Sequence, residues 1–401
     1  MYFVGNLFLN GGARSSPAAV IARIVLCGAT LLAASLVMLQ TIPARGTAQV
    51  TATPSPLAPD DRDALRELIA ARDWNHVAAA LALSAEHSPN DPEIHYWRGL
   101  LLGANNPAAI DELRRALVSE PLRPQAQAAL DALLRDPAAS LAERWTALGV
   151  ALVGAGEWAW AHHAFDAALA ADPLHVTALA YRGFAKDRQG LDGLADIKAA
   201  QALGPREPAG YYFAGLHWRA AGDYAASHQA FLAAHFLAPD SPAFAAEVGS
   251  ALELLGAYSD AEPWYRMAVE LAPDEPSWYA LLARFYVDSG YRPDDAAFAF
   301  VEAAAARFEQ DADLAASLGW ALFQQGEHQR AYDALNRALT MAPDSVRARY
   351  YFGLALERLG DREGAADSLW FALDAAGLED VYGLRAARAL QRLGYTVEAR
   401  P

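Results

Sequence analysis

A small residue recurs through residues 149–353 at an almost constant interval. Four of the six steps between successive positions are 34 residues long, one is 32 and one is 36. The residue is glycine at six positions and alanine at one: Gly149, Gly183, Gly215, Gly249, Ala283, Gly319 and Gly353. A period of this length predicts one short structural unit that is stacked many times, because a single unit cannot bury its own apolar face.

Residues 142–175 show what one such unit contains. Four residues occupy the i, i+3, i+4 and i+7 positions of one helical face: Trp145, Leu148, Gly149 and Leu152. Gly156 then ends this helix. A second helical face follows before Pro173, which cannot continue a helix: Trp158, Ala161, Phe165 and Ala168. The unit is therefore predicted to be an antiparallel helix pair in which Gly149 and Ala161 allow the two helices to approach closely.

This unit resembles the tetratricopeptide repeat, whose pattern is W-x2-L-G-x2-Y…A-x3-F…P. Seven positions match, with leucine in place of the tyrosine: Trp145, Leu148, Gly149, Leu152, Ala161, Phe165 and Pro173. Three later units match in the same register, through Tyr211, Gly215, Phe231 and Pro239, then Gly249, Ala261, Tyr265 and Pro273, then Leu318, Gly319, Ala331 and Pro343. The pattern is broken where Lys186 replaces an apolar residue and where residues 291–293 are inserted.

The resemblance implies an all-α fold, a right-handed superhelical solenoid of antiparallel helix pairs with about nine units. An N-terminal transmembrane or signal helix is expected to precede this TPR-like solenoid. Residues 58–141 are interpreted as divergent N-terminal helical repeats that end in one unpaired helix, and residues 142–379 as regular TPR-like repeats. Residues 380–401 are predicted to form a C-terminal capping helix and tail, because a solenoid needs a polar end.

The N-terminus differs in composition from the repeats. Residues 24–42 are a run of 19 residues without charge, preceded by Arg14 and Arg23 and followed by a Pro/Thr/Ala-rich linker, residues 43–57. Residues 1–42 are therefore a membrane anchor, which needs about 17–25 apolar residues, or a cleaved signal peptide. Because basic residues precede the run, both alternatives predict an exported repeat body, either membrane-anchored and extracytoplasmic or secreted.

Composition narrows the functional classes. The chain carries 32 Lys+Arg and 48 Asp+Glu, a net charge of −16, and an acidic surface disfavours nucleic acid as a partner. Its one cysteine, Cys27, excludes an intrachain disulfide and a cysteine-based zinc site. No P-loop, dinucleotide-binding, GxSxG or HExxH motif occurs, so the sequence predicts no enzyme, no cofactor and no metal site.

The first helix of each pair is expected to line a concave surface, where positions not needed for packing are free to bind a partner. This inner stripe is rich in aromatic and arginine side chains, which tend to anchor interfaces. The predicted partner-binding groove consists of Phe184, Tyr212, Leu216, Arg219, Arg284, Trp320, Phe323, Tyr350 and Leu354. An exposed stripe would bind an apolar or amphipathic peptide, with Arg219 and Arg284 as charged anchors. The alternative is a tightly wound superhelix that buries the stripe against itself.

Two functions fit such a groove. The first is a non-enzymatic interaction scaffold, membrane-tethered or exported, that binds a peptide or protein partner. The alternative is an envelope glycan- or lipid-binding module that uses the same aromatic side chains as stacking surfaces. In both cases the membrane is contacted through the N-terminal segment.

Residues 156–173 contain two tryptophans and two histidines, which invites comparison with a ligand or metal site. Trp158 is a repeat position and is expected in the core. His162 and His163 are adjacent on a helix, so they point about 100° apart and are poorly placed to share a metal. Trp160 is not required by the repeat; it is expected on the outer face, as a second contact surface.

Overall fold

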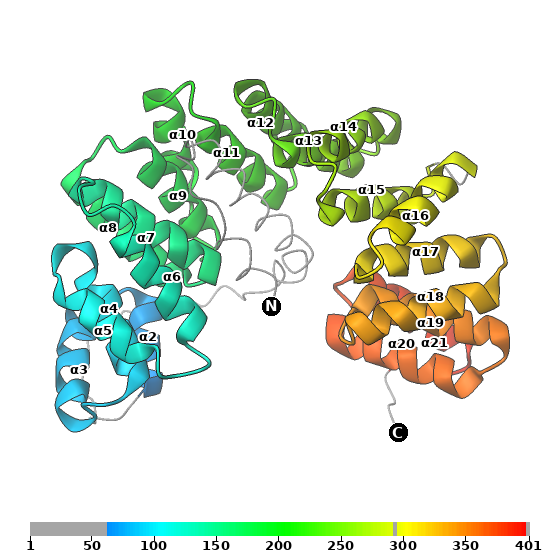
Figure 1. Cartoon of the computed structure of the whole chain (residues 1–401), viewed down its shortest axis with the longest axis horizontal. Helices are drawn as coiled ribbons and strands as arrows, with labels where there is room; N and C mark the ends of the chain where they lie inside the picture. The colour runs from blue at the N-terminus through cyan, green and yellow to red at the C-terminus, as the bar shows by residue number, and fades with distance from the viewer. Residues whose placement is uncertain (1–61, 292–294, 398–401) are drawn as a thin grey trace. The chain divides into compact units, whose positions relative to one another are not determined.

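The computed structural model describes residues 62–291 and 295–397, which are helical with short turns (Figure 1). No strand occurs in these ranges. The predicted anchor or signal peptide, residues 1–42, and the linker, residues 43–57, lie outside them. Among the helices of the described ranges, none is both long enough and apolar enough to cross a membrane.

The described residues form two compact units. Unit 1, residues 62–238, contains α2 (Arg62–Ala71), α3 (Trp74–His87), α4 (Pro92–Leu102), η1 (Gly103–Asn105), α5 (Ala108–Ala116), α6 (Arg123–Leu134), α7 (Leu141–Ala155), α8 (Trp158–Ala171), α9 (Val176–Asp187), α10 (Leu194–Leu203), α11 (Pro208–Ala220) and α12 (Tyr224–Leu237). Unit 2, residues 239–291 and 295–397, contains α13 (Pro242–Leu254), α14 (Tyr258–Leu271), α15 (Pro276–Ser289), α16 (Asp295–Arg307), α17 (Ala312–Gln324), α18 (His328–Met341), α19 (Val346–Leu359), α20 (Arg362–Ala376) and α21 (Val381–Arg392). The repeat period runs through residue 238 without a change, so it gave no sign of this division.

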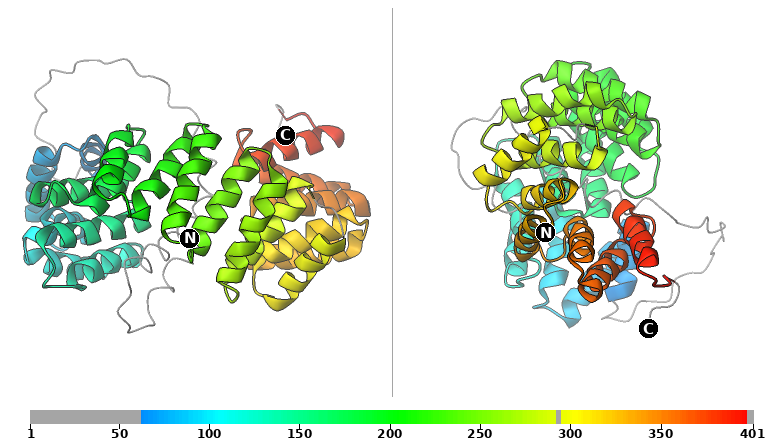
Figure 2. Two further views of the ribbon diagram at one scale, coloured as in Figure 1. Left: turned by 90° about the horizontal axis from the view of Figure 1, so that it is seen from above. Right: turned by 90° about the vertical axis from the view of Figure 1, so that its right-hand side faces the viewer.

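Within each unit, helices that follow one another in the chain pack side by side (Figure 2). The pairs are α2/α3, α4/α5, α7/α8, α9/α10 and α11/α12 in unit 1, and α13/α14, α15/α16, α17/α18 and α19/α20 in unit 2. Only α6 and α21 stand outside a pair among the described helices. The all-α fold of stacked helix pairs is thus confirmed, and the handedness of the solenoid stays a prediction.

The recurring glycines lie where the two helices of a pair touch. A Cβ atom at Gly149 would lie 2.5 Å from Cε1 of Phe165, and a Cβ atom at Gly319 would lie 2.5 Å from Cγ of Leu335. Five further glycines face a buried side chain of the partner helix within 3.2 Å in the same way: Gly99, Gly183, Gly215, Gly249 and Gly353. The prediction that these small residues mark the close approach of two helices is confirmed.

The junction between the first two pairs and the regular repeats is built around Trp145. Its ring packs over η1, and its indole N–H donates to Oδ1 of Asn105 at 3.0 Å. Gly103 has a φ of 46°, and a Cβ atom there would lie 2.0 Å from the ring of Trp145. Only glycine fits this position. The unpaired α6 packs between α5 and α7.

Candidate interaction site

In unit 1, the predicted groove residues are only partly accessible. Phe184 is half-buried, with its ring stacked on Phe213 at a centroid distance of 4.9 Å and an interplanar angle of 19°. Tyr212 is 4% exposed and packs against Phe213 and Phe231. The expectation that Tyr212 faces solvent is therefore wrong, because neighbouring rings of its own helix pair enclose it.

Leu216 and Arg219 continue the same face of α11, and both are half-buried. The guanidinium of Arg219 lies 5.3 Å from the ring centroid of Phe231, a distance at which a cation and an aromatic face attract each other. Unit 1 thus offers a smaller inner surface than the sequence suggested, with Phe184, Leu216 and Arg219 as its accessible members.

In unit 2, Trp320 and Phe323 form part of a stack of three rings. Trp320 stacks on Phe323 at 5.0 Å and 14°, and on Tyr351 at 4.3 Å and 11°. The indole N–H of Trp320 donates to the carbonyl oxygen of Val287 at 3.0 Å, which fixes the ring. The predicted pairing of Trp320 with Phe323 is present, and both side chains remain half-buried.

Tyr350 and Leu354 do not contribute to an open surface. Tyr350 is 9% exposed and Leu354 is 6% exposed. The closing helix α21 packs against α19, and Tyr382 of α21 lies 6.1 Å from Tyr350, centroid to centroid. The expectation that these two residues face solvent is wrong, because the closing helix α21 packs against their helix α19.

The polar centre of unit 2 is Asp288, at the end of α15. Its carboxylate accepts hydrogen bonds from the hydroxyls of Tyr351 at 2.5 Å and Tyr382 at 2.6 Å, and it pairs with Arg347 at 3.2 Å. Burial acts to raise the pKa of Asp288, but the charge of Arg347 and the two hydroxyl donors outweigh it, so the net pKa is lowered. Burial beside this carboxylate raises the pKa of Tyr382 to about 12. The carboxylate therefore stays ionised and joins three helices, α15, α19 and α21.

Sequence reasoning missed this cluster entirely. The partners of Asp288 lie 59, 63 and 94 residues away along the chain. The 34-residue period fixes contacts within a pair and between neighbouring pairs, but these contacts join more distant units. The available signal was an aspartate at the end of a first helix, where the packing pattern does not require a charge.

Arg284 lies one helical turn before Asp288 in α15 and is exposed. Its charge reaches Glu253 of α13. Burial raises the pKa of Glu253, while a hydrogen bond from Tyr265 and the charge of Arg284 act in the opposite direction. Of the nine predicted groove residues, Arg284 is thus the most accessible, and its surroundings in unit 2 are acidic and aromatic.

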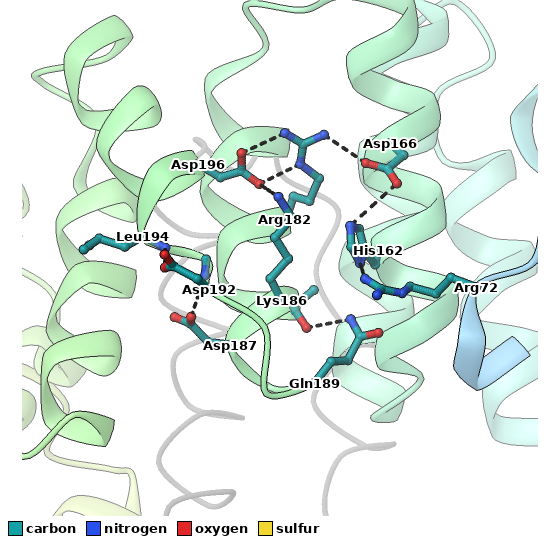
Figure 3. Close-up of polar contacts among 12 residues, drawn as sticks. Arg72, His162, Asp166, Arg182, Lys186, Asp187, Gln189, Asp192, Leu194 and Asp196 are labelled. Atoms are coloured by element: carbon teal, nitrogen blue, oxygen red, sulfur yellow. Dashed lines mark hydrogen bonds and ion pairs between the residues drawn. The ribbon is translucent and has the colours of Figure 1, made fainter. Parts of the chain in front are cut away.

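A second polar network joins α8, α9 and α10 in unit 1 (Figure 3). Arg182 donates from Nε to Asp196 at 2.7 Å and from Nη1 to Asp166 at 2.9 Å. Lys186, which breaks the apolar pattern of the repeat, has its Nζ atom 2.8 Å from the same Asp196. The departure from the repeat pattern at Lys186 is therefore explained by an ion pair with the second helix of its own pair.

The expectation for Trp160 is wrong. Its side chain is 1% exposed, and its ring lies 5.0 Å from that of Trp74 in α3. The first helix pair covers this part of α8, since His163 also lies 4.3 Å from Trp74 and Nη1 of Arg72 lies 3.2 Å from Nδ1 of His162 (Figure 3). Within the described ranges no group of three or more His, Cys, Asp or Glu residues is arranged to hold a metal ion.

The repeat units coincide with a known sequence family. A family model described as tetratricopeptide repeat matches residues 146–191, 219–276 and 282–346. These ranges include four of the recurring glycines: Gly149, Gly183, Gly249 and Gly319. These three regions of the chain therefore consist of tetratricopeptide repeats. Proteins of this family are generally non-enzymatic scaffolds for protein–protein interaction.

Several solved structures resemble the tetratricopeptide repeats of this chain. A thermophilic tetratricopeptide repeat protein of Thermus thermophilus is 22% identical with a TM-score of 0.39, and the match covers 46% of this chain and 99% of that one. Yeast Tom70 is 14% identical with a TM-score of 0.44, over 83% and 88% of the two chains. YrrB, described as a tetratricopeptide repeat protein with an unusual peptide-binding site, is 18% identical with a TM-score of 0.33, over 48% and 97%. A search of curated proteins returned no match.

Two histidines of α8, the buried His162 and the half-buried His163, make unit 1 sensitive to acid. Burial lowers the pKa of both His162 and His163 below the ordinary value of about 6.5. As the pH falls, these histidines are therefore protonated at a higher pH in the unfolded chain than in the folded one. Unit 1 should lose stability below about pH 6.5, because protonation favours the unfolded state. His163→Phe keeps an aromatic ring beside Trp74 and should flatten the dependence of the melting temperature on pH. The control His87→Gln, at an exposed site, should leave that dependence unchanged.

Proposed function

We propose that this chain is a non-enzymatic scaffold that binds an amphipathic peptide or protein segment on the inner face of unit 2. The observation that carries the proposal is the exposed cation Arg284 in the same unit as the half-buried rings of Trp320 and Phe323. A carboxylate of the partner pairs with Arg284, and its apolar side chains cover the edges of the two rings. Arginine and aromatic residues are the types that most often dominate binding energy at interfaces.

The half-buried Phe184, Leu216 and Arg219 give unit 1 a second patch of the same chemistry. The proposal also includes a location: residues 1–42 tether the repeat body to a membrane or direct its export. Treating intact cells or vesicles with protease from outside, and sequencing the N-terminus of the mature protein, tests this part separately. Complete protection of the repeat body in intact cells would contradict export.

Site-specific crosslinking tests the binding surface. Benzoylphenylalanine placed at position 323 should crosslink to a defined partner, whereas the same residue at the exposed Leu378, between α20 and α21, should not. Arg284→Glu reverses the charge of the proposed anchor in the same unit and should lower the crosslinking yield from position 323 by about tenfold. Equal yields from positions 323 and 378, with or without Arg284→Glu, would exclude the inner face of unit 2 as the binding surface.

A further inference from the structure

Unit 1 contains a pocket of about 550 Å³. It opens where α2, α4 and the first turn of α8 meet, and its volume falls in the range of about 300–1,000 Å³ that is common for ligand pockets. Aromatic and carboxylate side chains dominate its lining: Glu93, Tyr96, Trp97, Glu157, Trp158 and Trp160. No residue of the predicted groove lines it.

The two carboxylates of the pocket differ in their partners. Glu93 is neutralised by Arg66 of α2, whose Nη2 atom lies 2.8 Å from its Oε1. Glu157, directly before α8, makes no ion pair or side-chain hydrogen bond with any residue in the part of the chain that the structure describes. Burial raises the pKa of Glu157, and the negative charge of Glu93 raises it further. Within the described ranges, the pocket wall therefore contains one carboxylate without a counter-ion.

The hydroxyl of Tyr96 is the second unsatisfied group. The side chain is 1% exposed, and its hydroxyl has no hydrogen-bond partner within the described ranges. Burial and the charge of Glu157 both raise its pKa, which places the two groups in one electrostatic environment. A buried hydroxyl without a partner destabilises the folded chain. A ligand in the pocket that satisfies both Tyr96 and Glu157 removes this cost.

Two of the tryptophan rings that line the pocket already carry a guanidinium group on one face. Arg66 lies 5.9 Å from the ring centroid of Trp97 while it binds Glu93. Arg188 lies 5.1 Å from the ring centroid of Trp158. Both contacts use an indole face, and the indole is the aromatic ring that attracts a cation most strongly. The same wall is therefore suited to one more guanidinium, next to the carboxylate that lacks a partner.

We propose that this pocket binds an arginine side chain of a peptide partner, with Glu157 as the counter-ion and Trp158 as the aromatic wall. The hydroxyl of Tyr96 accepts a hydrogen bond from one N–H of the guanidinium. Other N–H groups of the same guanidinium donate to the Glu157 carboxylate. The net charge of −16 favours the approach of a basic segment. The volume exceeds that of one side chain, so the residues flanking the arginine enter with it.

A matched pair of peptides tests the assignment with the full-length chain in detergent solution. The probe is a fluorescein-labelled heptapeptide of alanine and serine with one central arginine, and its control carries citrulline, which has the same shape without the charge. Anisotropy should show binding of the arginine peptide and at least tenfold weaker binding of the citrulline peptide. Equal affinities, or no binding of the arginine peptide up to about 1 mM, would overturn the proposal.

Variants separate the pocket from general charge effects. Glu157→Gln and Tyr96→Phe should each lower the affinity for the arginine peptide, and Glu157→Gln should lower it by at least tenfold. Glu67→Gln changes the same charge at an exposed site of α2 outside the pocket and should leave affinity unchanged. If Glu67→Gln and Glu157→Gln lowered the affinity equally, the effect would come from net charge alone, and the proposed site would be refuted.

The two pocket variants should stay folded, so a lower affinity would not result from unfolding. Glu157→Gln removes a carboxylate that burial destabilises, and Tyr96→Phe removes a hydroxyl without a partner, so neither should lower the melting temperature. Arg45 is the arginine of the linker, residues 43–57, and could compete with the peptide. Peptide binding that appears only after Arg45→Gln would assign the pocket to this linker and overturn binding of a partner. Failure of the crosslinking at position 323 bears only on unit 2 and leaves this pocket unaffected.

Discussion

Asp288→Ala is expected to destabilise unit 2 by about 3–5 kcal/mol, the usual cost of removing one partner of a buried ion pair. Arg347 is 8% exposed and would keep its charge without the carboxylate that balances it. The hydroxyls of Tyr351 and Tyr382 would lose their acceptor in the same step. The expected result is a clear decrease in the guanidinium chloride midpoint, followed by tryptophan fluorescence.

A double-mutant cycle identifies the cause. Arg347→Met in the Asp288→Ala background removes the unpaired charge and should recover part of the lost stability, because an apolar side chain can replace a buried ion pair. Asp274→Ala is the control: its side chain is 93% exposed and pairs with Arg307 at the surface, so the midpoint should not change. Similar midpoints for Asp288→Ala and Asp274→Ala would show that the cluster does not hold unit 2 together.

The architecture followed from the sequence because its determinants are local. Each recurring glycine faces a large side chain 14 or 16 residues later in the chain, as Gly149 faces Phe165 and Gly183 faces Ile197. A period of this kind is visible in one sequence, since both halves of the contact lie within one unit. The helix pairs and the close approach of their helices could therefore be predicted without any knowledge of the tertiary contacts.

The accessible surface did not follow from the sequence, because distant units determine it. Trp160 is covered by Trp74 of the first helix pair, and Tyr350 is covered by the closing helix α21. The repeat pattern predicts equivalent neighbours for every unit. Units at the ends of a solenoid and at its irregular junction have different neighbours. Of the predicted groove, Arg284, Trp320 and Phe323 remain accessible in unit 2, whereas Tyr212, Tyr350 and Leu354 belong to the core.

The same substitution at two glycines of α7 should have very different effects. Gly149→Val is expected to destabilise unit 1 by about 3 kcal/mol, because the added atoms would overlap the ring of Phe165, which is fully buried. Gly154→Val should leave stability unchanged within about 0.5 kcal/mol, because a Cβ atom there meets nothing within 4 Å. Helix propensity slightly favours valine over glycine at both sites, so it cannot produce the difference.

The close approach of the two helices is tested by coupling Gly149→Val to Phe165→Ala. Phe165→Ala alone should cost about 3–5 kcal/mol through the cavity it creates between α7 and α8. Together the two changes should cost less than their sum, because the valine fills space that the ring has left. Additive losses of stability in the double variant would mean that the recurring glycine is not required for the close approach of the partner helix. Equal losses of stability for Gly149→Val and Gly154→Val would mean the same. The alternative explanation of the 34-residue pattern would then be backbone conformation, although Gly149 has an ordinary helical φ.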